Sequence, residues 1–421
     1  MEQTNLSTPA LNARNIFTCR LSDNQVLLYA PLAGSAAIIS EDEVSRLEDS
    51  AAKGDQDEDL ATLSQRDADI LEIAGPDTVS ELSVLINQRC NFSCSYCYSA
   101  NGRDNQELGK EQLRRILDWF IHADRGKELD IVFSGGGDPM LSFTGLQSGI
   151  DFAIRKAHGE NIKLNIGIVT NGSTLSDKQM DFIKKHEIGL VVSFDILKEI
   201  QNAQRSHYDI VVGTIDRLIE KNIVSGIRST ITPLNVCRQE EMVEELHRRY
   251  PGIRSAAFET VLNPDLFSSP QDLEQFYMDF EAHLFAAQDL GRRYGITIGN
   301  TVINNVDSCK VRACLGKLVV TPDGTITACS RLSSAKEYYF NEFAYGKVDV
   351  DGTTFNREKY IRLMNENVNT DVACQSCIAK WHCRGGCLLA RRSLSKEYFD
   401  CYCRFMRRMV VHALMNKLSE S

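Results

Sequence analysis

Segments with the pattern of β-strands alternate with segments that have the pattern of α-helices throughout residues 81–261, and this alternation restricts the possible folds most strongly. Six apolar segments are predicted strands: residues 83–87, 129–133, 162–169, 188–194, 224–231 and 255–261. Five amphipathic segments between them are predicted helices: residues 107–123, 143–157, 176–186, 210–222 and 239–249. Because repeated strand–helix units form parallel sheets, we expect an α/β protein with its reactive groups at the carboxyl ends of the strands.

The composition excludes several classes of protein. The chain has 421 residues, 43% of them hydrophobic and 25% charged, and its formal net charge is −10. An acidic chain lacks the excess of Lys and Arg that a general nucleic-acid binder needs. No apolar run approaches the ~20 residues of a membrane span, and residues 1–15 lack the layout of a signal peptide. We therefore expect a cytoplasmic protein without nucleic-acid or membrane partners. Of its 14 cysteines, those at motif spacings are expected to be metal ligands rather than disulfides, and Cys19 and Cys237 are left over as inert thiols.

Three cysteines lie close together directly after the first predicted strand. Cys90, Cys94 and Cys97 are separated by three residues and then by two. Three thiolates on one loop can hold three irons of a cubane iron–sulfur cluster and leave the fourth iron without a protein ligand. The alternatives are unliganded thiols or a zinc site, but zinc prefers four ligands and no histidine lies near this loop.

This Cys-x3-Cys-x2-Cys spacing, with Tyr96 before the third cysteine, resembles the motif of the radical S-adenosylmethionine (SAM) enzymes. In that superfamily the amino and carboxylate groups of SAM bind the open iron, and one electron splits SAM to give a deoxyadenosyl radical. The six strand–helix units match the partial, TIM-like (β/α)6 barrel of the superfamily. The resemblance therefore implies SAM and a 4Fe-4S cluster as cofactors.

Polar and glycine residues that follow later strands are candidate SAM contacts. Gly135, Gly136, Gly137 and Asp138 resemble the family's Gly-Gly-Glu-Pro motif, which binds the SAM amino group, with one extra glycine and Asp in place of Glu. Glycines allow a ligand to approach the backbone closely. Four further candidates follow the same resemblance: Asn171, Ser193, Asp195 and Arg205. A helix cap or a turn is the alternative role for each of them. Weaker candidates around the fifth strand are Arg228, Thr230 and Asn235.

A second set of cysteines occupies the C-terminal part of the chain. Its spacings resemble the seven-cysteine pattern of the SPASM domain, an appendage of radical SAM enzymes that modify peptides and proteins. By that resemblance a first auxiliary 4Fe-4S cluster has the ligands Cys309, Cys314, Cys329 and Cys387. The second has the ligands Cys374, Cys377, Cys383 and Cys403, with Cys401 as a competitor for the last position. A four-cysteine zinc ribbon is the alternative for the later set.

The chain is predicted to have three parts. Residues 1–80 form a small α+β segment with a hairpin (25–30 and 36–40) and helices at 41–51 and 64–74. This segment is either a leader-peptide recognition domain or an extension that packs on the barrel. Residues 81–300 form the barrel and end in a linking helix at 271–293. Residues 301–421 form the SPASM domain.

The resemblance implies a maturase that takes hydrogen from a residue of a ribosomally made precursor peptide. We expect SAM and three 4Fe-4S clusters as cofactors, and an electron donor such as flavodoxin or ferredoxin. Anaerobic sulfatase maturases are the nearest alternative, but they carry an Asp directly after the cysteine that corresponds to Cys329, where this chain has Ser330 and Arg331. An iron–sulfur redox sensor is an alternative of another class. The sequence does not identify the catalytic base.

Overall fold

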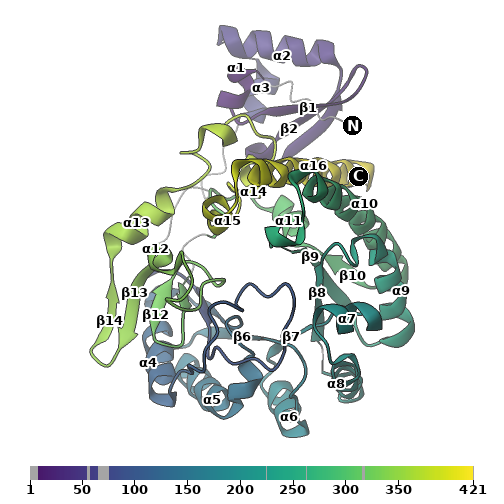
Figure 1. Cartoon of the computed structure of the whole chain (residues 1–421). Helices are drawn as coiled ribbons and strands as arrows, with labels where there is room; N and C mark the ends of the chain where they lie inside the picture. Colours follow the sequence, from purple (N-terminus) through teal and green to yellow (C-terminus); the bar gives the residue numbers. More distant parts are fainter. Residues whose placement is uncertain are drawn as a thin grey trace.

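An 11-stranded sheet organises most of the protein (Figure 1). The computed structural model describes residues 8–54, 57–64, 75–223, 225–261, 263–314 and 318–420. Six parallel strands neighbour one another in chain order: β4 (Glu81–Val84), β5 (Glu128–Phe133), β6 (Lys163–Thr170), β7 (Gly189–Ser193), β8 (Ser225–Ile231) and β9 (Ser255–Thr260). All six predicted strands are therefore present, although Val224, where one of them was expected to begin, lies outside the described residues.

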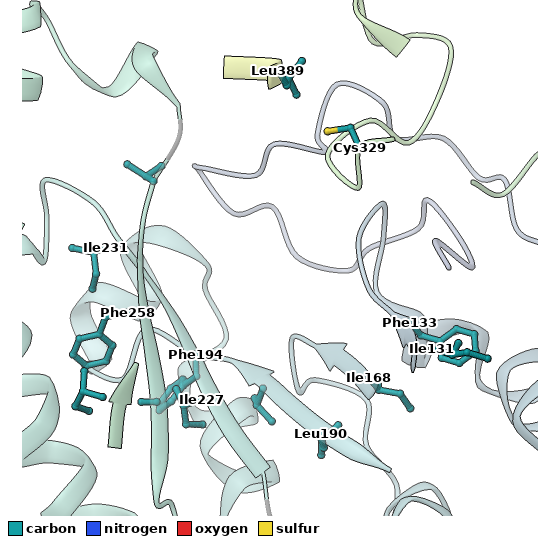
Figure 2. Packing of buried hydrophobic residues seen from close by; sticks show 14 of the residues in the cluster. Ile131, Phe133, Ile168, Leu190, Phe194, Ile227, Ile231, Phe258, Cys329 and Leu389 are labelled. Carbon is teal, nitrogen blue, oxygen red and sulfur yellow. The ribbon is translucent and has the colours of Figure 1, made fainter. Parts of the chain in front are cut away.

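Helices cover the outer side of this sheet (Figure 1). They are α4 (Lys110–Phe120), α5 (Phe143–Gly159), α6 (Asp177–Lys185), α7 (Lys198–Gln204), α8 (Tyr208–Glu220) and α9 (Gln239–Arg249). Their apolar faces pack against alternate residues of the strands, and the buried side chains form one continuous core. Figure 2 shows Phe194, Ile227, Ile231 and Phe258 gathered beside the strands, whereas Cys329 and Leu389 lie apart from them. The sheet and its helices thus confirm the predicted α/β class.

The first strand ends earlier than predicted, so the residues that follow it belong to the site rather than to the sheet. β4 ends at Val84 rather than at residue 87; the backbone N–H of Leu85 still donates to Val320 O (2.9 Å), and the chain then leaves the sheet. Residues 85–109, which we call the cysteine loop, connect β4 to α4. This loop occupies the carboxyl end of the parallel strands, where reactive groups collect in such folds.

The sheet continues at both edges beyond the predicted strands. β10 (Thr297–Gly299) adds a parallel strand beside β9, and β11 (Leu318–Val320) pairs parallel with β4. Three antiparallel strands follow β11: β12 (Thr325–Thr327), β13 (Ala344–Asp349) and β14 (Gly352–Phe355). The boundary expected at residue 300 therefore does not interrupt the sheet.

The C-terminal part is otherwise helical. The linking helix α10 (Pro270–Tyr294) is present as predicted and packs along the last helix, α16 (Lys396–Glu420). Shorter helices lie between them: α11 (Thr301–Asn304), α12 (Phe340–Phe343), α13 (Arg357–Asn365), α14 (Lys380–Cys383) and α15 (Leu388–Ser393). Single 3-10 turns are η1 (Pro31–Ala33), η3 (Ala123–Arg125), η4 (Pro139–Ser142), η5 (Val236–Arg238), η6 (Pro264–Leu266), η7 (Asn305–Asp307) and η8 (Val372–Cys374). Within the described residues, none of the helices combines the length and apolar character that crossing a membrane requires.

The N-terminal part forms a small separate layer above α16 (Figure 1). Its elements are α1 (Pro9–Ala13), β1 (Phe17–Ser22), β2 (Gln25–Ala30), β3 (Ser35–Ile39), α2 (Glu41–Lys53) and α3 (Glu58–Leu63). The predicted hairpin and first helix are present, and Ser40 and Glu43 form a capping box at the start of α2. β1 and α3 were not predicted, and the helix expected at residues 64–74 lies, after Ser64, outside the described residues.

Buried hydrogen bonds join this layer to the C-terminal part. The hydroxyl of Tyr29 lies 2.5 Å from Nε2 of His382, and Nδ1 of His382 lies 3.0 Å from Asn305 O. Burial lowers the pKa of His382 to about 4, so the ring is neutral, accepts from Tyr29 and donates to Asn305. Nε1 of Trp381 donates to the Asn15 side chain (3.2 Å). These contacts fix β1 and β2 next to the C-terminal cysteines.

Candidate active site at the cysteine loop

N–H donors face the thiols of the cysteine loop. The Arg103 guanidinium donates to Cys97 Sγ (3.0 Å) and to Phe92 O (2.9 Å). The amide of Asn171 donates to Asn91 Oδ1 (2.9 Å) and, more weakly, to Cys90 Sγ (3.8 Å). Hydrogen bonds of this kind stabilise thiolates and tune iron–sulfur clusters. Arg103 is a functional candidate that the sequence did not reveal, since nothing in the motif specifies an arginine six residues after Cys97.

The donor set fits an iron–sulfur cluster better than a single ion. Burial raises the pKa of Cys94, Arg205 opposes this shift, and Cys97 and Cys90 add to it, so the three thiols lie within electrostatic reach of one another. Nowhere in the described part of the chain do three Cys, His, Asp or Glu side chains converge on one metal ion. A cubane binds each thiolate to a different iron and needs no such convergence.

The glycine loop, residues 134–138, lies directly against the start of the cysteine loop. The backbone N–H of Gly137 donates to Asn87 O (2.9 Å), and that of Asp138 donates to Arg89 O (2.8 Å). A Cβ atom on Gly137 would lie 1.9 Å from Arg89 O, and one on Gly136 would lie 2.7 Å from Asn87 O. The glycines are therefore needed for this close packing, which holds the start of the cysteine loop in place.

Replacing Gly137 by alanine is expected to displace the cysteine loop, because the added methyl group meets backbone that cannot rotate away. Overpacking of this kind costs about 1–3 kcal/mol. We expect an equivalent fall in the apparent free energy of unfolding, measured in urea, together with less iron bound per chain. Gly145→Ala in α5 is the matched control, because a Cβ there meets no atom within 4 Å. Equal iron content in the two variants would contradict the supporting role.

Asp138 holds two strand ends together. Its carboxylate accepts hydrogen bonds from Thr170 Oγ1 (3.0 Å), from Asn171 N (2.6 Å) and from Met140 N (3.0 Å), and the residue is only 3% exposed. Burial raises the pKa of Asp138, and the bonds from Asn171 and Met140 oppose that shift. The side chain thus ties the end of β5 to the end of β6. The SAM contact predicted for Asp138 stays a prediction.

A buried network connects Tyr96 to the end of β7. The Tyr96 hydroxyl donates to Asp195 Oδ2 (2.8 Å) and accepts from Arg205 (2.8 Å). Asp195 also accepts from Gln204 Nε2 (3.1 Å) and from the backbone N–H of Thr230 (3.1 Å). The structure therefore brings together three predicted residues and adds Gln204, which no motif indicated.

Arg205 keeps one donor available in this network. Burial lowers the pKa of Arg205, but Tyr96, Asp195 and Cys94 outweigh it and leave the pKa raised, so the guanidinium stays charged. Its Nε is buried and has no hydrogen-bond partner among the described residues. A SAM carboxylate next to Cys94 would satisfy it by a charge-assisted bond. Ser193, the last residue of β7, lies at the same strand end.

Replacing Asp195 by alanine is expected to leave the Arg205 charge buried without its partner. Asp195 is linked to Arg205 through the Tyr96 hydroxyl rather than by a direct ion pair, and leaving the buried donors of this network without their acceptor costs roughly 1–3 kcal/mol. We expect the apparent free energy of unfolding to fall by that amount and SAM binding to weaken, as measured by urea titration and calorimetry. Asp209→Ala is the control, since Asp209 is 80% exposed and pairs with Lys198 at the surface. A D195A protein as stable as the control would contradict the network's role.

Four C-terminal cysteines line one cavity of about 300 Å³: Cys374, Cys377, Cys383 and Cys403. Burial raises the pKa of Cys383, and Cys377, Cys403 and Cys374 raise it further. The Arg391 guanidinium donates to Cys374 Sγ (3.6 Å). Thr18 and Cys19 of β1 complete the cavity wall.

Cys401 faces away from that cavity. Its thiol donates to Pro270 O (3.3 Å) at the start of α10 and accepts from Arg404 (3.2 Å). Because Cys401 and Cys403 are two residues apart on α16, only one of them can point toward the other cysteines. The geometry supports Cys403 as the fourth ligand.

The first auxiliary set is brought together in part. Burial raises the pKa of Cys329 to about 12, with Cys387 and Cys314 as further causes. The Cys309 thiol instead donates to Pro31 O (3.5 Å), at the junction with the N-terminal layer. The role of Cys309 as the fourth ligand of this set stays a prediction.

The radical SAM superfamily profile matches residues 84–248, which contain the cysteine loop, the glycine loop and the Tyr96 network. The chain is 28% identical over 189 residues to the uncharacterized protein MJ0907 of Methanocaldococcus jannaschii, a match that covers 44% of this chain and 63% of that protein. It is 22% identical to the radical SAM cyclopropyl synthase TigE of Paramaledivibacter caminithermalis, over 76% of this chain and 70% of TigE. It is 24% identical to a cysteine-type anaerobic sulfatase-maturating enzyme of Clostridium novyi, over 73% of this chain and 88% of that enzyme.

Solved structures share the fold of almost the whole chain. Native anSMEcpe with bound AdoMet and Kp18Cys peptide superposes with a TM-score of 0.64 at 17% identity, over 81% of this chain and 100% of that one. Streptococcus suis SuiB bound to the precursor peptide SuiA superposes with a TM-score of 0.52 at 14% identity, over 91% of this chain and 97% of SuiB. Residues 84–248 of this chain therefore match the radical SAM superfamily, and they are set in a fold that the chain shares with anSMEcpe and SuiB.

Proposed function

We propose that this protein is a peptide maturase that takes a hydrogen atom from a residue of a ribosomally made precursor and leaves an oxidative crosslink. The observation that carries the proposal is the position of Tyr98. The Arg331 guanidinium carbon, from the segment that follows Cys329, lies 5.7 Å from the centre of the Tyr98 ring, and Tyr98 directly follows Cys97, so the cysteine loop and this part of the first auxiliary set are neighbours. An auxiliary cluster held there would be close enough to the proposed site of hydrogen abstraction to accept an electron.

The residues present fit the proposed cofactors. When bound, SAM and its cluster would supply a deoxyadenosyl radical, and an auxiliary cluster would accept the electron that the substrate radical loses. The proton that the substrate releases would pass to solvent or to a basic side chain. Cys90, Cys94 and Cys97 would hold the first cluster, while Arg103 donates to Cys97. Arg205 and the glycine loop would hold SAM. A flavodoxin or ferredoxin in a cytoplasmic compartment would supply electrons.

The N-terminal layer is proposed to bind the leader of the precursor. Its three strands are ordered β1-β2-β3, which leaves two edge strands to which an extended peptide could add main-chain hydrogen bonds. Its fixed attachment through Tyr29 and Asn15 would hold such a leader at a constant distance from the site.

The test is co-expression with a short precursor encoded beside the gene, followed by mass spectrometry. A loss of two hydrogens per crosslink supports the proposal, and a core peptide without its leader should react far more slowly. Cluster-loaded protein given SAM and dithionite should also form deoxyadenosine and methionine. Absence of both products would indicate a redox sensor instead.

Sulfatase maturation is the second candidate, favoured by the likeness to the Clostridium novyi enzyme. Ser330 and Arg331 follow Cys329 where such maturases carry an Asp, and this difference argues against sulfatase maturation. A peptide from a sulfatase separates the two activities. An aldehyde that reacts with a hydrazide reagent would indicate maturation, whereas a crosslink would not react.

A further inference from the structure

An accessible tyrosine stands between the cysteine loop and the C-terminal part. Tyr98 is 49% exposed, and the Arg331 guanidinium carbon lies 5.7 Å from the centre of its ring. Surrounding protein raises the pKa of Tyr98; Cys97 and Cys329 add to the shift, and Arg228 and Arg331 oppose it. Arg331 therefore lies next to an accessible ring, and Arg228, Cys97 and Cys329 are within electrostatic reach of it.

The two arginines reach this place from different parts of the fold. Arg228 is exposed on β8 and pairs in register with Ser193 of β7, at the end of the sheet where SAM is expected. Arg331 follows Cys329, and residues 330–337 lie on the barrel loops: Gln88 Nε2 donates to Ser333 O (2.7 Å), and a Cβ on Gly135 would lie 3.2 Å from Ser330 O. Arg331 is thus held over the cysteine loop.

Neither arginine is neutralised by a carboxylate. Other arginines of the chain are paired, for example Arg391 with Asp371 and Arg392 with Glu366. In the part of the chain that the structure describes, Arg228 and Arg331 form no ion pair within 4 Å, and the buried Nε of Arg331 has no hydrogen-bond partner. Glu337 acts on Arg331 from a distance, but its carboxylate accepts from Ser333 N (2.5 Å) and Ser334 N (2.9 Å).

We propose that Arg228 and Arg331 bind a carboxylate of the peptide substrate beside Tyr98, so that the residue attacked lies next to an Asp, a Glu or the C-terminus of the peptide. The inference rests on the proposed function and names its substrate class. Guanidinium groups bind carboxylates through charge-assisted, often bidentate hydrogen bonds. The Arg331 guanidinium also donates to Cys387 Sγ (4.0 Å), but neither cation has a carboxylate partner among the described residues, and both therefore favour a carboxylate over a neutral group.

The test measures binding of fluorescent peptides to the full-length, cluster-loaded protein with SAM present. Four 12-residue probes share one Gly/Ser/Ala sequence and carry a central Asp with an amidated C-terminus, a central Asn with an amidated C-terminus, a central Asn with a free C-terminus, or a central Lys with an amidated C-terminus. We expect the wild-type protein to bind the Asp or the free-acid probe at least about tenfold more tightly than the Asn amide, as one charged hydrogen bond allows. The better of these two probes identifies the source of the carboxylate.

Variants assign the preference to the two arginines. Arg228→Gln with Arg331→Gln should abolish it, and Arg228→Glu with Arg331→Glu should transfer it to the Lys probe. Arg115→Gln, at an exposed position of α4, is the control and should leave it unchanged. Equal or undetectable binding of all probes by the wild-type protein overturns the inference, as does a weaker affinity of R228Q for SAM with an unchanged peptide preference. Deoxyadenosine formation is measured in the same samples. If deoxyadenosine forms while the peptide preference is absent, the inference fails and the proposed function does not.

Discussion

Cys94→Ser is expected to reduce deoxyadenosine formation from SAM to the uncatalysed background. Cys94 is the middle ligand of the proposed SAM cluster and lies close to Arg205, the proposed partner of the SAM carboxylate. Losing this thiolate removes one of only three protein ligands, and a site with two cannot retain the cubane. We expect iron to fall from about twelve to about eight atoms per chain, as three clusters of four irons would give. The measurements are anaerobic iron and sulfide analysis and chromatography of the products.

The control for Cys94→Ser is Cys237→Ser. Cys237 is exposed on η5 and belongs to neither motif, so its loss should change neither iron content nor product formation. If C94S still produces deoxyadenosine at the rate of C237S, the cysteine loop is not the site of SAM cleavage.

Cys403→Ser is expected to remove the second auxiliary cluster, whereas Cys401→Ser should retain it. Cys403 lines the cavity with Cys374, Cys377 and Cys383, while Cys401 bonds to Pro270 O on α10. C403S should therefore lose about four irons per chain and the corresponding electron paramagnetic resonance signal. Because the first cluster is untouched, deoxyadenosine should still form, but crosslinked peptide should not.

The two cysteines make a matched pair, since they lie two residues apart on the same helix and receive the same substitution. C401S should keep a full set of irons and lose only a packing contact with α10. An iron deficit in C401S, with C403S complete, would reverse the assignment.

The six parallel strands β4 to β9 and five of the six helices that cover them could be predicted because each carries its own apolar pattern, whereas the short α7 was not predicted. β11 and β12 could not, since each has three residues and their place depends on pairing with β4 and with β13. β1 was missed although Phe17, Cys19 and Leu21 alternate with polar residues, a local strand pattern that the sequence analysis did not use. Pairing between distant segments, which a local pattern does not encode, accounts for most of the missing fold.

The same division holds for the site. Motif spacing identified the cysteines, the glycine loop and three residues of the Tyr96 network, namely Tyr96, Asp195 and Arg205. It did not show that the Asp138 carboxylate is turned toward Thr170 and Asn171, nor that Arg103 donates to Cys97. The role proposed for Tyr98 depends on its contact with Arg331, which is more than two hundred residues away along the chain. These relationships arise from the fold and have no local signature.

The wall that Thr18 and Cys19 of β1 contribute to the second auxiliary cavity changes how a shortened enzyme should be interpreted. Removing the N-terminal layer would open that cavity to water and dioxygen as well as removing a peptide-binding surface. A truncated enzyme would then lose activity through decay of its metal cofactor, even toward substrates that need no leader. Point substitutions on the strand edges, with β1 left in place to cover the cavity, are needed to separate the loss of peptide binding from the loss of the cluster.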